Sequence, residues 1–434
     1  MKKNDPKTIQ AWCLYDWANS VYSLTITSAI FPVYYQAVAV GEGGQDRVRF
    51  FGTEVVNSVL YSYSLSFSFL LVALVIPLLS GIADYSGKKK SFLRGFMFLG
   101  SLSCIGLFFF DGNNVEWGIM CSVFASVGYS ASLVFYDAFL PEITTPDQTD
   151  RVSARGYSMG YLGGVVLLVI NLVTIQFWDS LGFESQGFAT RLAFLTVGVW
   201  WMFFGLLSLS RLPSNVFGRK PSGGFLLNGY RELRKVWMEL KKSRNIRYFL
   251  LAFFFYNTGV QTTMYLAATF GSKELKMDDG KLIMTVLVIQ FLGIAGAYLF
   301  AHLSRRRGNV FSLMVMTIIW VGICVFAYFI SNEPEFYVLA ACVGLVMGGI
   351  QSLSRATFSK LIPVDSIDHA SYFSFYDVTY NVSIVLGTFS YGLVEQLTGS
   401  MRNSTLALGT YFFVGLLFLF TVKLPHVTSR PAQA

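Results

Sequence analysis

Charged side chains are scarce in this chain of 434 residues, because Asp, Glu, Lys and Arg make up only 13% of it. A soluble domain carries about 25%. Hydrophobic residues make up 54% and gather in long continuous runs. These properties exclude a soluble globular protein and indicate a polytopic membrane protein. We expect helices to span the membrane, because a helix satisfies its own backbone hydrogen bonds in lipid, whereas barrel strands would show short alternating segments.

The sequence also lacks the patterns of metal sites, disulfide frameworks and nucleotide-driven pumps. The five cysteines contain no C-x-x-C spacing, and His302, His369 and His426 lie near predicted helix ends or loops. No G-x-x-x-x-G-K-[ST] loop is present. We therefore predict no metal, no cofactor and no enzymatic activity. The net charge of +8 does not require a nucleic-acid partner, because the distribution of the charges explains it.

Twelve apolar runs have about the 20 residues that a membrane span requires. They lie at roughly 9–37, 54–79, 91–110, 116–140, 156–178, 189–210, 246–270, 280–302, 310–330, 336–361, 372–396 and 404–423. If both termini lie inside, 26 of the 33 Lys and Arg residues are on the inner side and 7 are outside. This asymmetry predicts cytoplasmic termini by the positive-inside rule. In a bacterium the predicted location is the inner membrane.

A long basic connection at 212–245 divides the spans into two sets of six. We therefore predict an N-terminal bundle at 1–211 and a C-terminal bundle at 246–434. Within the connection, apolar residues recur at helical spacing among basic ones and predict an amphipathic helix on the anionic inner leaflet. A simple tether is the alternative. The apolar stripe consists of Leu226, Tyr230, Leu233, Trp237 and Leu240.

The two halves repeat each other in sequence. A polar, basic turn is predicted at 81–90, between two apolar runs, and residues 301–308 occupy the same place about 220 residues later. Pro141 and Pro363 are related by a similar offset, and Ser304 stands near the place of Asp84. Parallel repeats of this kind predict two related bundles around a central cavity. The residues that we expect to latch one side are Gly81, Asp84, Gly87, Lys88, Lys89, Arg151 and Arg155.

The pattern G-x-x-D-x-x-G followed by three Lys residues resembles the signature loop of the major facilitator superfamily. The stretches 12–20, 135–142, 151–164 and 348–355 are more specific and resemble the UMF1/Atg22-like branch of that superfamily. The resemblance implies an all-α membrane protein with twelve transmembrane helices in two pseudo-symmetric six-helix bundles. It also implies secondary transport, and fungal members are associated with amino-acid efflux from vacuoles. Asp137 departs from the pattern, because many relatives carry Asn there.

Ionisable side chains within a span are costly and usually face a cavity. Asp16, Ser20, Ser23 and Thr27 form a polar stripe along one face of the first span, and we predict a substrate or proton path along it. The alternative for Asp16 is a clamp on a loop base such as Arg155. The guanidinium of Arg355 suits recognition of a substrate carboxylate, or alternatively forms an interhelical salt bridge.

Further polar residues complete the set of predicted substrate-binding or coupling residues: Asn19, Tyr136, Asp137, Tyr256, Asn257, Gln261, Gln351, Tyr376, Asp377, Tyr380 and Asn381. Proton coupling through Asp16, Asp137 or Asp377 is one hypothesis. The other is a structural network in which these acids neutralise Arg151, Arg155 and Arg355.

The predicted function is secondary active transport of a small polar solute by alternating access, with amino acids and proton coupling as the specific expectation. The partners that we expect are a small-molecule substrate, membrane lipids and protons, and we expect a monomer. Two alternatives stay open. One is a transporter of lipid, another amphiphile or another metabolite with the same fold, and the other is a non-transporting membrane receptor.

Overall fold

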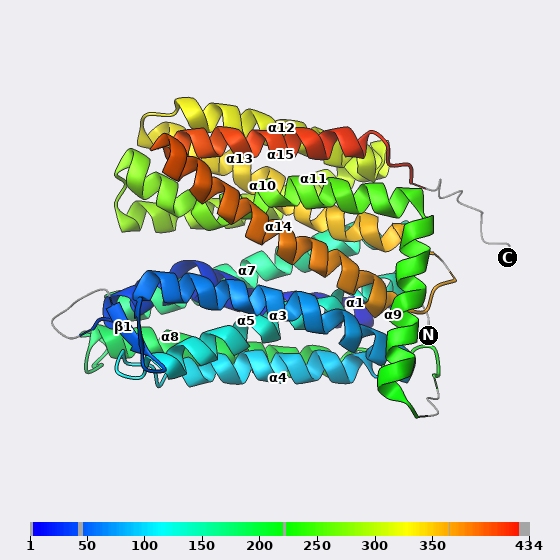
Figure 1. Cartoon of the computed structure of the whole chain (residues 1–434), viewed down its shortest axis with the longest axis horizontal. Coiled ribbons are helices and arrows are strands. Elements are labelled where there is room, and N and C mark those ends of the chain that lie inside the picture. Colours follow the sequence, from blue (N-terminus) through cyan, green and yellow to red (C-terminus); the bar gives the residue numbers. More distant parts are fainter. Residues whose placement is uncertain (1–2, 42–46, 220–222, 364, 425–434) are drawn as a thin grey trace.

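The computed structural model describes residues 3–41, 47–219, 223–363 and 365–424, so His426 lies outside the described residues. Two layers of roughly parallel helices face each other (Figure 1). The lower layer comes from the chain before α9 and the upper layer from the chain after it. Helix α9, Phe225–Lys242, crosses the right-hand end of both layers. We call this the α9 end and call the opposite end, which carries β1, the β1 end.

Helices account for most of both layers. The lower layer contains α1 (Pro6–Val21), the π-helical segment η1 (Tyr22–Ala29), α2 (Phe31–Val38), α3 (Asn57–Ser86), α4 (Lys89–Leu107), α5 (Val115–Asp137), α6 (Leu140–Ile143), α7 (Thr149–Gln176) and α8 (Gln186–Arg211). The upper layer contains α10 (Arg244–Leu275), α11 (Asp279–Arg307), α12 (Asn309–Phe329), α13 (Glu333–Leu361), α14 (His369–Thr398) and α15 (Met401–Leu419). The most extensive contacts between the layers join α7 with α11 and α13, and α3 with α14.

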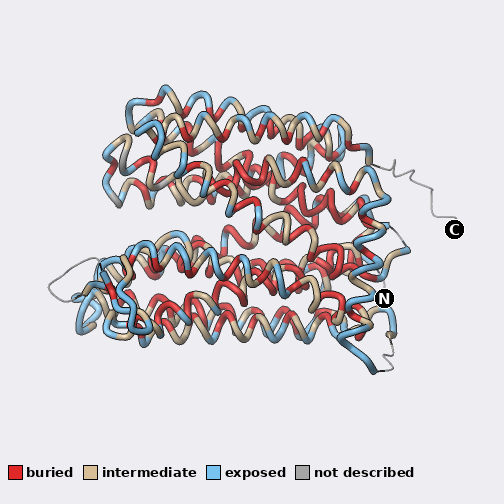
Figure 2. The backbone as a smooth tube through the Cα atoms, in the orientation of Figure 1, coloured by how far each residue is buried: buried red, intermediate tan, exposed pale blue. Residues whose placement is uncertain are grey.

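Seven of the described helices are long and apolar enough to cross a membrane by length and composition alone: α3, α5 with α6, α7, α8, α11, α12 and α13. The continuous unit α1–η1–α2 and the helices α4, α10, α14 and α15 lie alongside them (Figure 1). Polar residues such as Asp16 and Asp377 lower the hydropathy of α1 and α14, but both are buried in protein and do not face lipid. Buried positions gather inside each layer and, between the layers, towards the α9 end (Figure 2).

The first span is one continuous unit but not one regular helix. It begins where the Asp5 side chain accepts a hydrogen bond from the Thr8 N–H at 2.9 Å and Pro6 occupies the first turn. In η1 the turns widen, and the Ile30 N–H donates to the carbonyl oxygen of Thr25, five residues earlier, at 2.8 Å. This corrects the prediction of a single regular helix over 9–37, because apolar periodicity does not distinguish a π-helical turn from an α-helical one.

The predicted turn at 81–90 is largely helical. Helix α3 continues to Ser86 and ends at Gly87, whose φ of +67° is favourable for glycine, and α4 begins at Lys89. Gly81 therefore does not reverse the chain. It permits the close approach of α9 instead, because a Cβ atom at Gly81 would lie 2.2 Å from the carbonyl oxygen of Gly229.

A short hairpin precedes α3. Strands β1 (Arg47–Phe50) and β2 (Thr53–Val56) pair antiparallel, with Phe50 opposite Thr53. The predicted second span began at 54, inside β2. This boundary is wrong because the apolar end of β2 continues directly into the apolar start of α3.

Helix α9 packs mainly against α3 and also touches α14. It buries Val236 and Leu240, whereas Leu226, Tyr230 and Trp237 are exposed. The predicted apolar stripe is therefore buried against the protein only in part. The side towards the protein is narrow because Gly229 brings the helix axis close to α3, and several large apolar residues are left on the outer side.

Candidate functional site

A cavity of about 190 Å³ lies between the two layers. The lower layer lines it from α1, η1, α3, α5 and α7, and the upper layer from α10, α11, α13 and α14. The polar stripe of the first span faces it, and the wider turns of η1 add Ser28, whose Oγ donates to the Ser23 carbonyl oxygen at 2.9 Å. The other predicted residues that line the cavity are Asp137, Gln261, Gln351, Arg355, Tyr376, Asp377 and Tyr380.

Arg355 forms a polar tie between the layers at this cavity. It extends from α13 in the upper layer and is 1% exposed. One terminal nitrogen lies 3.0 Å from Asp137 Oδ1, and the other lies 3.2 Å from Asp16 Oδ2. The guanidinium also donates to the hydroxyl and the carbonyl oxygen of Ser153, each at 3.0 Å. All three partners belong to the lower layer, so one side chain joins α13 to α1, α5 and α7.

Aromatic rings hold this cluster in place. The guanidinium carbon of Arg355 lies 4.7 Å from the ring centroid of Trp12 and 4.2 Å from that of Tyr157, within the range of a cation–π contact. Tyr136 stacks on Trp12 and donates its hydroxyl to Asp16 Oδ2 at 2.7 Å. Tyr136 thus orients Asp16 from behind and does not itself line the cavity.

Gly156 on α7 leaves the space that the cluster occupies. A Cβ atom at this position would lie 2.5 Å from Asp16 Oδ2 and 2.9 Å from a terminal nitrogen of Arg355. Contacts this short require the neighbouring atoms to move. The glycine at 156 therefore permits the ion pair, whereas Gly160 and Gly163 of the same helix permit the close approach of α1.

Asp377 has a different environment from the other two acids. Its Oδ2 accepts a hydrogen bond from Asn381 Nδ2 at 2.8 Å, and in the described part of the chain no basic group lies within ion-pair distance. Among the described lining residues the acids and bases are Asp16, Asp137, Asp377 and Arg355. Formal acid charge thus exceeds formal basic charge in the cavity.

Five predicted site residues lie behind the cavity wall: Asn19, Tyr136, Tyr256, Asn257 and Asn381. The Tyr256 hydroxyl bonds to Ser354 Oγ at 2.7 Å, and Asn257 Nδ2 donates to Ser383 Oγ at 2.6 Å. These bonds fix the packing of α10 against α13 and α14. In this structure the residues support the wall and do not contact the cavity.

Sequence reasoning missed several residues of the wall, chiefly Tyr129, Tyr157, Tyr161, Tyr265 and Gln290. Tyr161 donates its hydroxyl to Gln351 Oε1 at 2.6 Å and forms a second link between the layers. A signal was present for two of them, because Tyr157 and Tyr161 stand one turn apart on α7. A turn-spaced pair of phenols beside Gly156 and Gly160 indicates a polar helix face.

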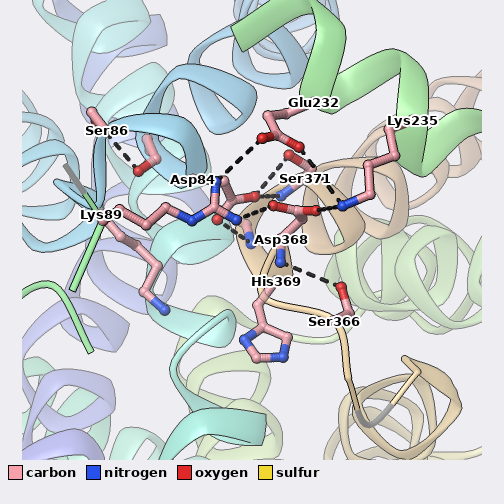
Figure 3. Close-up of polar contacts among 12 residues, drawn as sticks. Asp84, Ser86, Lys89, Glu232, Lys235, Ser366, Asp368, His369 and Ser371 are labelled. Carbon is pink, nitrogen blue, oxygen red and sulfur yellow. Dashed lines mark hydrogen bonds and ion pairs between the residues drawn. The ribbon is translucent and has the colours of Figure 1, made fainter. Parts of the chain in front are cut away.

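At the α9 end, Asp84 joins α3 to the first turn of α14 (Figure 3). Its Oδ2 accepts from both the backbone N–H and the hydroxyl of Ser371, each at 2.7 Å, and its Oδ1 accepts from the Ala370 N–H at 3.2 Å. A carboxylate suits the amino end of a helix, where backbone N–H groups lack partners. Nearby, Glu142 pairs with Lys89, and Glu142 Oε1 lies 3.1 Å from His369 Nδ1 of the other layer.

The connection between the layers adds further polar contacts at the α9 end. Asp368, just before α14, pairs with Arg219, and Lys235 of α9 donates to it at 2.8 Å (Figure 3). The hydrogen bond to Asp368 raises the pKa of Lys235 above its ordinary value, so Lys235 stays protonated and keeps this bond at neutral pH. Tyr372 of α14 donates its hydroxyl to Glu239 of α9. Helix α9 is thereby fixed to both layers.

A second latch repeats the first with the acid on the other helix. Asp150, at the start of α7, accepts from Ser304 Oγ of α11 at 2.9 Å and from Asn309 Nδ2 at 2.7 Å, and lies 2.7 Å from Lys360 Nζ. Ser304 occupies the place that Asp84 occupies in the first half. The acid that seemed lost from the second repeat is therefore supplied across the interface.

Not every predicted latch residue lies in these contacts. Lys88, Arg151 and Arg155 are exposed, and in the described residues none has an acidic partner within 4 Å. Arg155 is not the partner of Asp16, which pairs with Arg355 instead. Gly87 and Lys89 do lie at the latch, since Lys89 pairs with Glu142 and Gly87 ends α3.

Two helical layers with a polar cavity between them have the architecture of the major facilitator fold. The structure is similar to that of the transporter FucP in the outward conformation, with a TM-score of 0.72 and 14% identity over 97% of this chain and 99% of FucP. It is also similar to the human organic anion transporter MFSD10 (TETRAN), with a TM-score of 0.71 and 11% identity over 96% and 100% of the chains.

The chain belongs to the family described as "Vacuole effluxer Atg22 like", whose model matches residues 4–430. It is 30% identical to the uncharacterized MFS-type transporter YxiO of Bacillus subtilis over 99% of this chain and 97% of the relative. It is 25% identical to autophagy-related protein 22 of Yarrowia lipolytica over 86% and 76% of the two chains. These findings confirm the predicted family and the all-α major facilitator fold, and the protein is an integral membrane transporter.

Proposed function

We propose that this protein moves amino acids across the membrane by proton-coupled alternating access. The main supporting observation is the ion pairing of Arg355 with Asp16 and Asp137, because it joins the two layers at the cavity itself. The segments 1–211 and 246–434 would move as two bodies on either side of this tie. We further propose that the protein acts as a monomer, with the basic α9 end in the cytoplasm.

The distribution of polar contacts supports a state closed at the α9 end. Asp84 and Asp150 tie the two layers together at that end, and Asp368 ties the upper layer to α9. At the β1 end, the pair of Lys281 with Glu333 joins two elements of the upper layer. Alternating access requires the ties at the α9 end to break when the cavity opens there.

A free amino acid has a carboxylate and an ammonium group close together. The cavity offers Arg355, which suits bidentate binding of a carboxylate, and Asp377, whose carboxylate lacks a basic partner among the described residues. Gln261 and Gln351 add amide groups to the wall. These complementary charges support an amino acid as the substrate.

Proton coupling follows from the cost of separating buried charges. Removing one partner of a buried ion pair typically costs about 3–5 kcal/mol. Protonation of Asp16 or Asp137 would remove the negative charge before Arg355 leaves. A substrate carboxylate at Arg355 would give the guanidinium a replacement partner, so both ligands promote the same movement.

The test is uptake into proteoliposomes with radiolabelled amino acids, measured with and without a pH gradient. We expect the gradient to drive accumulation of at least one amino acid. Arg355→Gln should abolish uptake of carboxylate-bearing substrates. Asp137→Asn should leave the exchange of amino acids across the membrane intact but remove their accumulation in response to the pH gradient. Asp179→Asn, at an exposed position, is the matched control.

Two results would contradict the proposal. Accumulation that is the same in the presence and absence of the gradient would exclude proton coupling. If no amino acid is taken up although the protein in the liposomes is correctly folded, amino acids are excluded as the substrate class.

A further inference from the structure

A second hollow, of about 590 Å³, lies at the α9 end on the outside of the lower layer. It is bounded by the start of α4, the end of α8 and the segment that follows α8. Its basic residues are Lys88, Lys90, Arg94 and Arg219, and its described lining contains no acid. Ser86, Ser91, Ser210 and Ser214 add hydroxyl groups. Ammonium, guanidinium and hydroxyl donors around one hollow suit a phosphate group.

Three of the four basic groups keep their charge available. Arg219 is paired with Asp368, but Lys90 donates only to the neutral carbonyl oxygen of Leu212, at 2.7 Å. Lys88 and Arg94 are exposed and have no acidic partner in the described residues. Lys90 and Arg94 stand four residues apart on α4, a spacing at which like charges repel. An anion between them would relieve this repulsion.

An apolar groove of about 320 Å³ continues from the hollow along α4. Lys88 and Ser91 line both spaces, and the groove continues past Phe92, Gly95 and Phe96 to Leu99. From residue 88 to residue 99 a helix rises about 16 Å. One leaflet of the hydrocarbon core is about 15 Å thick. The groove is therefore about as long as an acyl chain that crosses one leaflet.

We propose that the hollow and the groove together bind an anionic phospholipid. Its phosphate would lie among Lys88, Lys90 and Arg94, and one acyl chain would lie against Phe92 and Phe96. A free phosphate ion would use the basic hollow alone. The groove along the same helix favours the lipid, because Phe92, Phe96 and Leu99 give it an apolar lining and Gly95 is exposed there. The proposal does not depend on the identity of the transported solute.

Gly95 gives a direct test of the groove. A Cβ atom at this position would have no heavy atom within 4 Å, so larger side chains fit without a clash. Gly95→Leu fills the groove, whereas Gly95→Ala adds a single methyl group to the same helix position. The basic hollow is tested with Arg94→Gln. Its control is Arg305→Gln, an exposed arginine at the end of α11 that does not line the hollow.

The full-length chain, purified in detergent, is titrated with dioctanoyl phosphatidylglycerol, dioctanoyl phosphatidylcholine and inorganic phosphate, and binding is followed by native mass spectrometry. We expect phosphatidylglycerol to bind most tightly. Arg94→Gln should weaken the binding of phosphatidylglycerol about tenfold, as expected for the loss of one charge-assisted hydrogen bond, and Arg305→Gln should leave its affinity unchanged. Gly95→Leu should also weaken the binding of phosphatidylglycerol, and Gly95→Ala should not.

Equal affinity for phosphatidylglycerol and phosphatidylcholine would overturn the proposal, as would equal losses in Arg94→Gln and Arg305→Gln. Inorganic phosphate that binds as tightly as the lipid, with Gly95→Leu harmless, would also overturn it and assign the hollow to free phosphate. The melting temperature of each variant without lipid shows whether the fold is intact.

Discussion

Arg355 shows how one buried side chain can join the two layers through several partners. Its rigid planar group donates to Asp16, Asp137 and Ser153 at the same time. A lysine would carry the same charge but lacks this fork of donors. The arrangement depends equally on an absent side chain, since Gly156 provides the space.

Replacing Gly156 with Ala should therefore disturb the ion pair without adding or removing a charge. The new methyl group would displace Asp16 or Arg355, and overpacking of this kind costs about 1–3 kcal/mol. We expect a lower melting temperature for the purified protein and slower transport.

The comparison variant is Gly322→Ala, because a Cβ atom there meets nothing within 4 Å. That change should leave the melting temperature equal or higher, since alanine favours a helix interior over glycine. A Gly156→Ala protein as stable as this control would show that the cluster adapts to the methyl group.

At the scale of elements, α9 acts as a strap across the closed end. It contacts α3 through Gly81 and Gly229, and it reaches the start of α14 through Lys235 and Glu239. The strap thus holds contacts with both layers, and any opening at this end must release one set of them.

Gly81→Leu should lift α9 from α3, because even a Cβ atom at this position would lie 2.2 Å from the Gly229 carbonyl oxygen. Hydrogen–deuterium exchange should then become faster in α9 than in the wild type, while exchange in α12 stays the same. Unchanged exchange in α9 would mean that the strap moves with α3 and retains its bonds.

Over the whole molecule, the two latches divide the closure between α3–α14 and α7–α11. Asp84 accepts from the amino end of α14, and Asp150 accepts from Ser304 of α11. Neutral amides at both positions would donate as well as accept, and would weaken both interfaces at once.

The double variant Asp84→Asn with Asp150→Asn should therefore spend more time open at the α9 end. Ala301→Cys is a suitable reporter, because Ala301 is buried in a small cluster with Ala154 of the opposite layer. In a Cys342→Ser background, a membrane-impermeant maleimide should label this cysteine faster in the double variant. Equal labelling rates would show that other contacts keep this end closed.

Much of the fold could be predicted from the sequence, because long apolar runs, basic connections and a repeat at about 220 residues leave little choice of architecture. The polar stripe from Asp16 to Thr27 was also accessible, since buried polar groups at helical spacing indicate a cavity. The partner of Asp16 was not accessible. Arg155 and Arg355 were both compatible with the sequence, and only the packing of α13 against α7 decides between them.

The boundaries that failed have local causes. The apolar run of α3 ends before the helix does. The helix continues to Ser86 and ends at Gly87, whose positive φ terminates it. Tyr129, Tyr265 and Gln290 were missed because helices buried on several sides carry no single polar face that marks the cavity.

The π-helical segment η1 has one further consequence. Each of its widened turns holds an extra residue compared with an α-helix. If one such turn tightened, α2 and its Tyr34 and Tyr35 would swivel by about 100° around the span axis. Such a change would turn the part of this span towards the β1 end relative to Asp16, and it would break the hydrogen bond from the Tyr34 hydroxyl to the Phe110 carbonyl oxygen.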